Sequence, residues 1–363
     1  MLATARGIPV ATTSTATSAA GTVAAIVPVL DECERLGPCL EGLMAAPEAL
    51  AAIVVVDGGS SDGTQALVRG YAARDPRIRL VDASPVPDNW NGKAWNLACG
   101  LGATDPATTW ILTMDADVRP RPKLITSLLA HALAQRLDAF SAAPRLALSG
   151  PLESLIHPAF LATLVYRYGL PGNVATRARD VQANGQCFIV RRDLAVSADA
   201  FAAARTSRCD DVTIARHLVR SGARLGFYEG ADLATVRMYE SAGECWTNWP
   251  RSLSLRDEST KAFGLALDLA TIVAVQALPL ASIFASLLAR RPTTTLFFRI
   301  NLALALARLG VLAGTRRAYA SVPPTYWLAA LLDLPCALRL IQGALSRRHI
   351  WRGRTLVAEG FPR

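Results

Sequence analysis

Residues 110–118 read WILTMDADV, an apolar run that ends in two carboxylates, Asp115 and Asp117. The run is too short to cross a bilayer, and its residues suit a buried strand. We therefore expect both aspartates at the carboxyl end of a strand, where open α/β sheets bind ligands and side chains two apart share a face. Such a pair can hold Mg²⁺ or Mn²⁺ against a diphosphate that supplies the other oxygens. The alternative is a turn with two solvated aspartates.

Similar apolar runs recur on both sides of this stretch and alternate with helical patterns. They lie at residues 23–30, 53–57, 78–82, 139–148, 187–190 and 225–228. Continuous apolar strands that alternate with helices are typical of a parallel sheet covered on both faces. We therefore expect a doubly wound, mostly parallel α/β domain over residues 22–261, after a disordered leader at residues 1–21.

After residue 261 the composition changes to that of membrane segments. Three apolar stretches, at residues 262–289, 293–314 and 326–345, each approach the ~20 residues that cross a bilayer. Buried core helices are the alternative for all three stretches, and central charges favour that alternative more for the second and third stretches. We expect transmembrane or interfacial helices over residues 262–346 and a basic tail at residues 347–363. Three spans, or two spans and one interfacial helix, both remain open.

The composition of the whole chain also favours a membrane partner. Of 363 residues 52% are hydrophobic, and the net charge is +9. A basic chain can bind nucleic acid or an anionic membrane surface. The sequence has no aromatic-interleaved basic patch and no zinc-finger spacing, so we expect the bilayer and no nucleic acid. The seven cysteines form no CxxC pair, which predicts reduced thiols in a cytosolic compartment.

Two further segments carry groups that suit a nucleotide diphosphate. Asp57 ends the second apolar run, and the sequence GGSSDGT after it allows the backbone to approach a ligand closely. An ordinary turn is the alternative reading of that segment. Gly92 and Lys93 begin a helix, where free amides, the positive helix end and an ammonium group suit a phosphate. The alternative there is a solvated lysine.

Later polar residues suit an acceptor pocket and a catalytic base. Asn184, Gly185 and Gln186 precede a strand and could line a pocket, or form a plain loop. Asp210 and Asp211 begin a helix, where carboxylates can cap the helix or deprotonate a hydroxyl group.

Two segments carry apolar residues that a lipid could contact. Residues 152–164 carry apolar side chains at helical spacing, which predicts a helix that faces the acceptor or covers the sheet. Residues 244–251 read ECWTNWPR, and Trp249 with Arg251 could form a membrane-interface belt or a lid over a diphosphate.

Four motifs stand together in the order of a known family: DGGSSDGT at 57–64, GKAWN at 92–96, DAD at 115–117 and DD at 210–211. This set resembles family 2 glycosyltransferases of the GT-A fold, from about Val23 to Trp249. The segments NWNGKAW at 89–95 and WRGR at 351–354 are similar to the membrane-bound branch that glycosylates lipids. That branch includes ceramide glucosyltransferases, hopanoid-associated glycosyltransferases and carotenoid or carotenoic-acid glycosyltransferases.

The resemblance implies a role for each matching residue. Asp57 would contact the nucleotide, Asp115 and Asp117 would hold the metal and the diphosphate, with Mg²⁺ or Mn²⁺ as the cofactor. Asp211 would be the catalytic base. The donor site is further assigned to Pro28, Glu32, Lys93, Asp115, Trp249 and Arg251, and the acceptor pocket to Asn184, Gly185, Gln186 and Asp210.

The resemblance also implies an activity. It is inverting transfer of a sugar from a nucleotide-sugar, with a UDP-sugar expected, to a membrane lipid such as a carotenoid, hopanoid or ceramide-like lipid. The protein would lie at the cell membrane with its catalytic domain in the cytoplasm.

The sequence departs from the family pattern at two places. Gly58 stands where many members have a second aspartate, and the Gln-x-x-Arg-Trp motif is missing, which argues against a polysaccharide synthase. Two other functions remain open: a non-catalytic nucleotide-binding membrane scaffold, and sugar transfer to a polyprenyl phosphate. In the second case the acceptor phosphate would bind arginines, with Arg177, Arg179 and Arg205 available.

Overall fold

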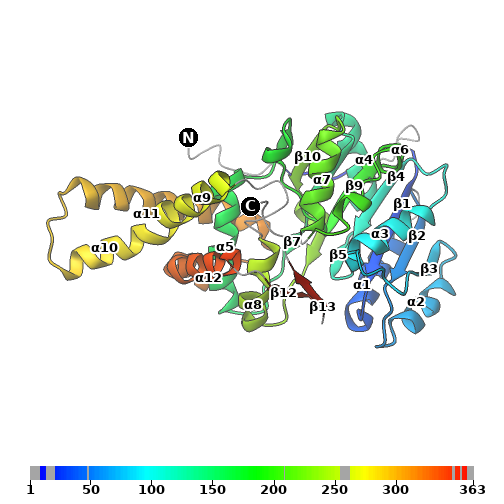
Figure 1. Ribbon diagram of the computed structural model, residues 1–363, viewed down its shortest axis with the longest axis horizontal. Helices are drawn as coiled ribbons and strands as arrows, with labels where there is room; N and C mark the ends of the chain where they lie inside the picture. The colour runs from blue at the N-terminus through cyan, green and yellow to red at the C-terminus, as the bar shows by residue number, and fades with distance from the viewer. Residues whose placement is uncertain are drawn as a thin grey trace.

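The structure is a computed structural model that describes residues 9–13, 21–46, 49–207, 209–253, 262–345, 348–351 and 354–357. Most of the leader expected at residues 1–21 lies outside these ranges, as does about half of the tail expected at 347–363. Figure 1 shows a sheet domain at one end of the molecule and a long helical hairpin that projects from the other end. Helices α5 (Glu153–Tyr168), α8 (Ala242–Ser252) and α12 (Asp333–Leu345) lie between them.

The main sheet contains eight strands within the described residues, in the order β3-β2-β1-β4-β9-β6-β10-β8. Their bounds are Val23–Val29 (β1), Leu50–Asp57 (β2), Ile78–Asp82 (β3), Trp110–Met114 (β4), Ala139–Ala143 (β6), Asn173–Ala175 (β8), Cys187–Arg191 (β9) and Leu225–Glu229 (β10). Strands β1 to β4 pair in parallel, as do β6 and β10, whereas β9 is antiparallel to β4 and β6. Strand β8 is antiparallel to β10. The predicted mostly parallel sheet is confirmed.

Helices cover both faces of this sheet, which explains why its strands are continuously apolar. The covering helices are Cys33–Met44 (α1), Thr64–Ala72 (α2), Gly92–Gly102 (α3), Leu124–Gln135 (α4), Arg192–Ser197 (α6) and Asp210–Arg220 (α7). In β1, Val23 and Ala25 belong to the core that contains α1 and α4 residues, whereas Ala24 and Ile26 pack with α3 and α7 residues on the other face. Alternate residues of one strand thus enter two different cores.

Two local predictions were wrong. Residues 139–148 do not form one strand, because β6 ends at Ala143 and β7 (Arg145–Leu146) belongs to a second, three-stranded sheet with β5 (Val118–Pro120) and β11 (Ala234–Val236). Pro144 between them has no N–H group to continue a strand ladder. Asp115 and Asp117 do not share a strand face either, because β4 ends at Met114 and both lie in the turn that leads to β5.

The hairpin contains two helices that are long and apolar enough to cross a membrane, judged by length and composition alone. They are Phe263–Leu288 and Leu296–Ala318. The first comprises α9 (Ala262–Thr271), a π-helical turn (Ile272–Ala277) and α10 (Leu278–Leu288), and the second contains α11 (Leu296–Thr315). The third apolar stretch is divided into a 3₁₀ helix (Pro324–Leu332) and α12, so it does not form a third such helix among the described residues.

A buried polar cluster joins the three apolar stretches. The Arg308 guanidinium donates to both oxygens of Asp333, at 2.7 and 2.9 Å, and the Gln276 amide donates to Asp333 at 3.0 Å. Gln276 also donates to the carbonyl of Ala159 in α5 at 2.7 Å. The charges that made the second and third stretches ambiguous in the sequence are therefore partners of each other, and they fasten the hairpin to α5.

Candidate functional site

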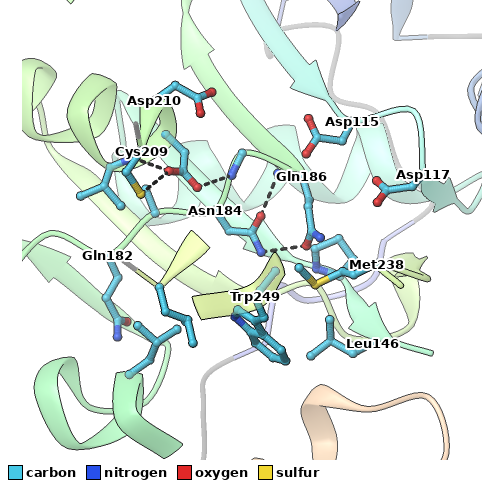
Figure 2. A pocket seen from close by; sticks show the side chains of 18 of the residues that line it. Asp115, Asp117, Leu146, Gln182, Asn184, Gln186, Cys209, Asp210, Met238 and Trp249 are labelled. Atoms are coloured by element: carbon cyan, nitrogen blue, oxygen red, sulfur yellow. Dashed lines mark hydrogen bonds between the residues drawn. The ribbon is translucent and has the colours of Figure 1, made fainter. Parts of the chain in front are cut away.

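A cavity of about 550 Å³ lies at the carboxyl ends of β1, β2 and β4 and extends to the base of the hairpin. Five predicted site residues come together in its wall: Lys93, Asp115, Asp117, Asp210 and Asp211. Parallel strands bring their carboxyl ends to one edge of a sheet, and this edge therefore collects residues that are far apart in the chain. Figure 2 shows the carboxylates of Asp115 and Asp210 directed toward each other across this end of the cavity.

Lys93 lies at the centre of the acid cluster. Asn91 caps α3 by accepting a hydrogen bond from the Lys93 backbone N–H at 2.9 Å, which fixes the start of the helix. The Lys93 ammonium then lies 2.7 Å from Asp115 Oδ1 and 3.7 Å from Asp210 Oδ2. Burial alone would lower the pKa of Lys93, but Asp115 and Asp210 raise it above its ordinary value. The lysine is therefore a permanent positive charge in the cluster.

Asp115 and Asp117 are the two carboxylates that the sequence assigned to a divalent cation. Burial, and then the charge of Asp115, raise the pKa of Asp117 to about 7. One Asp117 oxygen is buried without a hydrogen-bond partner among the described residues. A divalent cation would satisfy that oxygen and hold the carboxylate ionised. The described residues contain no group of three or more His, Cys, Asp or Glu arranged to hold a metal, so a cation here needs oxygens from a ligand.

Asp211 is held at the start of α7 by backbone groups. It accepts hydrogen bonds from Gly185 N–H at 3.0 Å, from Val212 N–H at 2.8 Å and from the Cys209 thiol at 3.4 Å. Burial, and then repulsion from Asp210, raise the pKa of Asp211 to about 6. A Cβ atom at Gly185 would lie 2.9 Å from the Lys93 ammonium, so glycine is what allows this close approach.

The predicted acceptor loop forms one wall of the cavity. The Asn184 amide donates to the Gln186 side chain at 2.9 Å, and Gln186 N–H donates back to Asn184 at 2.8 Å. Asn184 N–H donates to the hydroxyl of Ser141 on β6 at 3.0 Å. Both amide side chains are therefore held in place beside the acid cluster (Figure 2).

The remaining donor-side residues are placed differently from one another. Pro28 and Glu32 line the cavity. Asp57 is fully buried and does not line it, and its carboxylate accepts hydrogen bonds from Ser60 and, at 2.6 Å, from Gln65. Trp249 lines the cavity on the side away from the carboxylates (Figure 2). The side chain of Arg251 lies outside the described part of the structure.

Two features of the site were missed in the sequence. The buried Asn96 side chain donates to the carbonyls of Val29 and Val56 at 3.2 and 3.1 Å, which holds α3 against the ends of β1 and β2. The far wall of the cavity carries apolar residues from α5, the end of α8 and α12, beside Arg167 and Tyr168 of α5: Leu161, Leu164, Val165, Leu253, Leu340 and Gly343. The sequence carried two partial signals for this wall, the helical stripe at 152–164 and the apolar stretch at 326–345, but neither indicated that the two segments meet at the cavity.

Residues 24–195 match the family described as Glycosyl transferase family 2. This segment, slightly less than half of the chain, is therefore similar to family 2 glycosyl transferases. The match and the mostly parallel sheet with flanking helices confirm the predicted GT-A α/β fold. The matched segment contains Asp57, Lys93, Asp115, Asp117 and the acceptor loop, whereas the DD motif at 210–211 lies beyond it.

Two curated relatives come from Rhizobium meliloti (strain 1021). Lipopolysaccharide core biosynthesis glycosyltransferase LpsC is 35% identical over 112 residues, 31% of this chain and 37% of the relative. Succinoglycan biosynthesis protein ExoA is 36% identical over 58 residues, 16% of this chain and 18% of the relative. The matched segments thus span about a third or less of each relative. A solved structure, mannosyltransferase PcManGT from Pyrobaculum calidifontis with GDP-Man and Mn²⁺, has 18% identity and a TM-score of 0.49, covering 91% of this chain and 89% of that chain.

Proposed function

We propose that this chain is a membrane-associated glycosyltransferase that moves a sugar from a nucleotide-sugar to a lipid acceptor, with inversion at the anomeric carbon. The cavity carries the proposal, because it joins an acid cluster at the sheet edge to an apolar wall beside helices of membrane-spanning length. Such a cavity suits a charged donor at one end and a lipid at the other.

The donor would bind at the sheet edge. Asp115 and Asp117 are the proposed ligands of Mg²⁺ or Mn²⁺, and the donor diphosphate would complete the coordination. A bound divalent cation would supply positive charge for the diphosphate as it leaves. Lys93 would add a second positive charge from the start of α3. Pro28 and Glu32 would contact the nucleoside.

Asp57 has a different role in this proposal from the one the sequence indicated. Its hydrogen bonds to Ser60 and Gln65 hold the loop that carries Gly58, and Gly58 lines the cavity. We therefore propose that Asp57 shapes the nucleotide site through this loop.

Asp211 is the proposed general base. A carboxylate with a pKa of about 6 can accept a proton near neutral pH. The proton of an acceptor hydroxyl would pass to Asp211 while its oxygen bonds to the anomeric carbon, and the bond from that carbon to the diphosphate would break with its electron pair. Asp210 lies closer to Lys93 than Asp211 does and would hold the lysine in position. Asp210 would also line the acceptor pocket with Asn184 and Gln186.

The apolar wall supports a lipid as the acceptor. Leu161 and Leu164 of α5 and Leu340 of α12 line the cavity beside the hairpin base. We propose that Trp249 belongs to this acceptor side, because it lies away from the carboxylates (Figure 2). The names of LpsC and ExoA refer to lipopolysaccharide core and succinoglycan biosynthesis, so a saccharide acceptor is the competing proposal.

Transfer to a polyprenyl phosphate has less support. The arginines expected to bind its phosphate, Arg177, Arg179 and Arg205, do not line the cavity. Arg177 and Arg179 instead pair with Asp180 at 2.6 and 3.6 Å. Other arginines do line the cavity, and Arg317 at the base of the hairpin and Arg167 of α5 are two that an acceptor phosphate could meet.

The test is a transfer assay with the purified full chain in vesicles made from the lipid extract of the cells that produce it. Radiolabelled UDP-glucose and GDP-mannose are supplied in turn with Mn²⁺, and the label is separated into organic and aqueous phases. We expect metal-dependent nucleotide release and label in the organic phase. Label in a water-soluble glycan would favour the saccharide acceptor, and absence of nucleotide release with every donor would favour the non-catalytic scaffold.

A further inference from the structure

The hairpin sets the depth at which the molecule would lie in a bilayer, given the proposed membrane location. Helix α11 has 20 residues, which at about 1.5 Å per residue equals the ~30 Å of the hydrocarbon core. For an untilted hairpin that crosses the core, the near surface lies at Thr315. About 20 residues back from Leu288, the first arm reaches the level of Asp268, which pairs with Arg167 of α5 at 2.8 Å. Counted along the two arms, the near surface therefore lies at Thr315 and at Asp268, beside the ion pair with Arg167.

The buried polar cluster of Gln276, Arg308 and Asp333 lies inside the hydrocarbon core, on the lipid side of that surface. Arg308 precedes Thr315 by about seven residues, so it lies ~10 Å inside the core. Asp333 is bound to Arg308 and shares this depth. Helix α12 begins at Asp333 and leads back toward the sheet domain (Figure 1). Leu340, about seven residues further on, returns ~10 Å to the surface. The third apolar stretch thus enters the core and leaves on the same side.

The third apolar stretch, residues 326–345, has an exposed apolar side that is suited to contact with lipid. Its large apolar side chains are between 38% and 58% exposed, and they follow one another at helical spacing: Trp327, Leu328, Leu331, Leu334 and Leu338. An exposed apolar surface of this kind marks an interaction site. It lies at the same depth as the exposed apolar residues of the hairpin, among them Leu306 and Leu309, so the same bilayer would cover both.

Helices α8 and α12 separate this outer side from the catalytic cavity. On the inner side, Trp249, Leu340 and Gly343 line the cavity. On the outer side, a shallow hollow is lined by residues of the same two helices: Trp246, Pro335, Leu338, Arg339 and Gln342. Helices α8 and α12, which line both hollows, contact each other, and we call this contact the α8–α12 seam.

We propose that the lipid acceptor passes from the bilayer into the cavity through this α8–α12 seam. Its apolar chain lies against Trp249, Leu340 and Gly343 while its polar head reaches Asp211. Because Leu340 lies at the bilayer surface, the acceptor class that fits is a lipid with a small polar head whose reactive oxygen lies at that surface. This inference rests on the proposed function. It adds the route by which the lipid enters the cavity and the position of the lipid's apolar chain inside it.

Gly343 provides the test, because a Cβ atom there meets nothing within 4 Å. Gly343→Leu adds a side chain to the acceptor channel and is a favourable change for helix α12. Gly70→Leu is the matched control, because Gly70 lies inside α2, has the same open space around it and does not line the cavity. In the vesicle assay we expect Gly343→Leu to lower label in the organic phase about tenfold or more, as overpacking of a binding site does. Nucleotide release to water should persist, and Gly70→Leu should match the unaltered chain.

Three outcomes would overturn the inference. Equal lipid labelling by Gly343→Leu and the unaltered chain would place the acceptor elsewhere. Loss of lipid labelling and of nucleotide release together in both Gly343→Leu and Gly343→Ala would show that Gly343 supports the fold or the donor site and does not line an acceptor channel. If the unaltered chain labels only water-soluble products, the proposed lipid acceptor itself is wrong.

Discussion

Asp211 is the proposed general base, and the variant Asp211→Asn tests this role. Asp211→Asn keeps the size of the side chain and removes its ability to accept a proton. The amide oxygen can still accept from Gly185 N–H or from Val212 N–H, but its NH₂ group will face the other donor. One lost hydrogen bond costs about 1–3 kcal/mol in a buried site, which we expect the fold to tolerate. For a hydroxyl acceptor, loss of a general base lowers the rate about 10²–10⁴-fold, or about 3–5 kcal/mol of barrier.

The pH profile separates a base from a structural carboxylate. A base acts when deprotonated, so a pKa of about 6 predicts that kcat/KM is level above pH 6 and falls about tenfold per pH unit below it. The assay measures transfer over pH 4.5–8 (a range of about 3.5 units) with donor affinity measured separately. The fall in kcat/KM below pH 6 should be absent in Asp211→Asn, whose donor affinity should be unchanged. The same fall should remain in Asp210→Asn.

A near-normal rate for Asp211→Asn would refute the reasoning for a hydroxyl acceptor. It would then favour an acceptor that is already ionised, such as a phosphate or a carboxylic acid. If Asp210→Asn is inactive and Asp211→Asn is active, the general base is Asp210.

The other predictions concern the metal, the membrane and the polar cluster. Asp117→Asn should weaken Mn²⁺-dependent UDP binding at least about tenfold in calorimetry, because it halves the charge of a two-carboxylate site; unchanged binding in EDTA would contradict a metal role. The full chain should float with vesicles in a density gradient, and recovery in the soluble fraction without detergent would refute membrane association. Arg308→Met should destabilise the detergent-solubilised protein by about 3–5 kcal/mol in thermal unfolding because it leaves the buried Asp333 without its positively charged partner, and the double variant with Asp333→Leu should recover most of that loss.

The sheet and the acid cluster could be predicted from the sequence, because polar residues directly follow the apolar runs that form the strands. Continuous apolar runs indicated buried parallel strands, and the polar residues that follow them had to meet at one edge. The division at Pro144 was visible as a proline within an apolar run, but the prediction gave more weight to the run. The position of Asp115 and Asp117 depended on where β4 ended, and strand ends are hard to locate from apolarity alone.

The pairing of distant groups could not be derived in the same way. Arg308 and Asp333 each looked like a costly charge in an apolar stretch, because the sequence does not reveal which charges meet. The same holds for Asp57, whose carboxylate is engaged by Gln65 within the next helix. The apolar wall of the cavity combines α5, α8 and α12, and no single segment of the chain carries its pattern.

The fastening of the hairpin to α5 has a mechanical consequence. Because Gln276 and Arg308 bond to backbone carbonyls of α5 as well as to Asp333, the hairpin cannot slide along α5 without breaking buried polar contacts. A bilayer thinner or thicker than the hairpin would therefore be met by tilting the whole molecule, at a cost of fractions of a kcal/mol per Å of mismatch. Tilt would change the height of the catalytic cavity above the lipid head groups, so turnover should depend on the acyl-chain length of the host membrane.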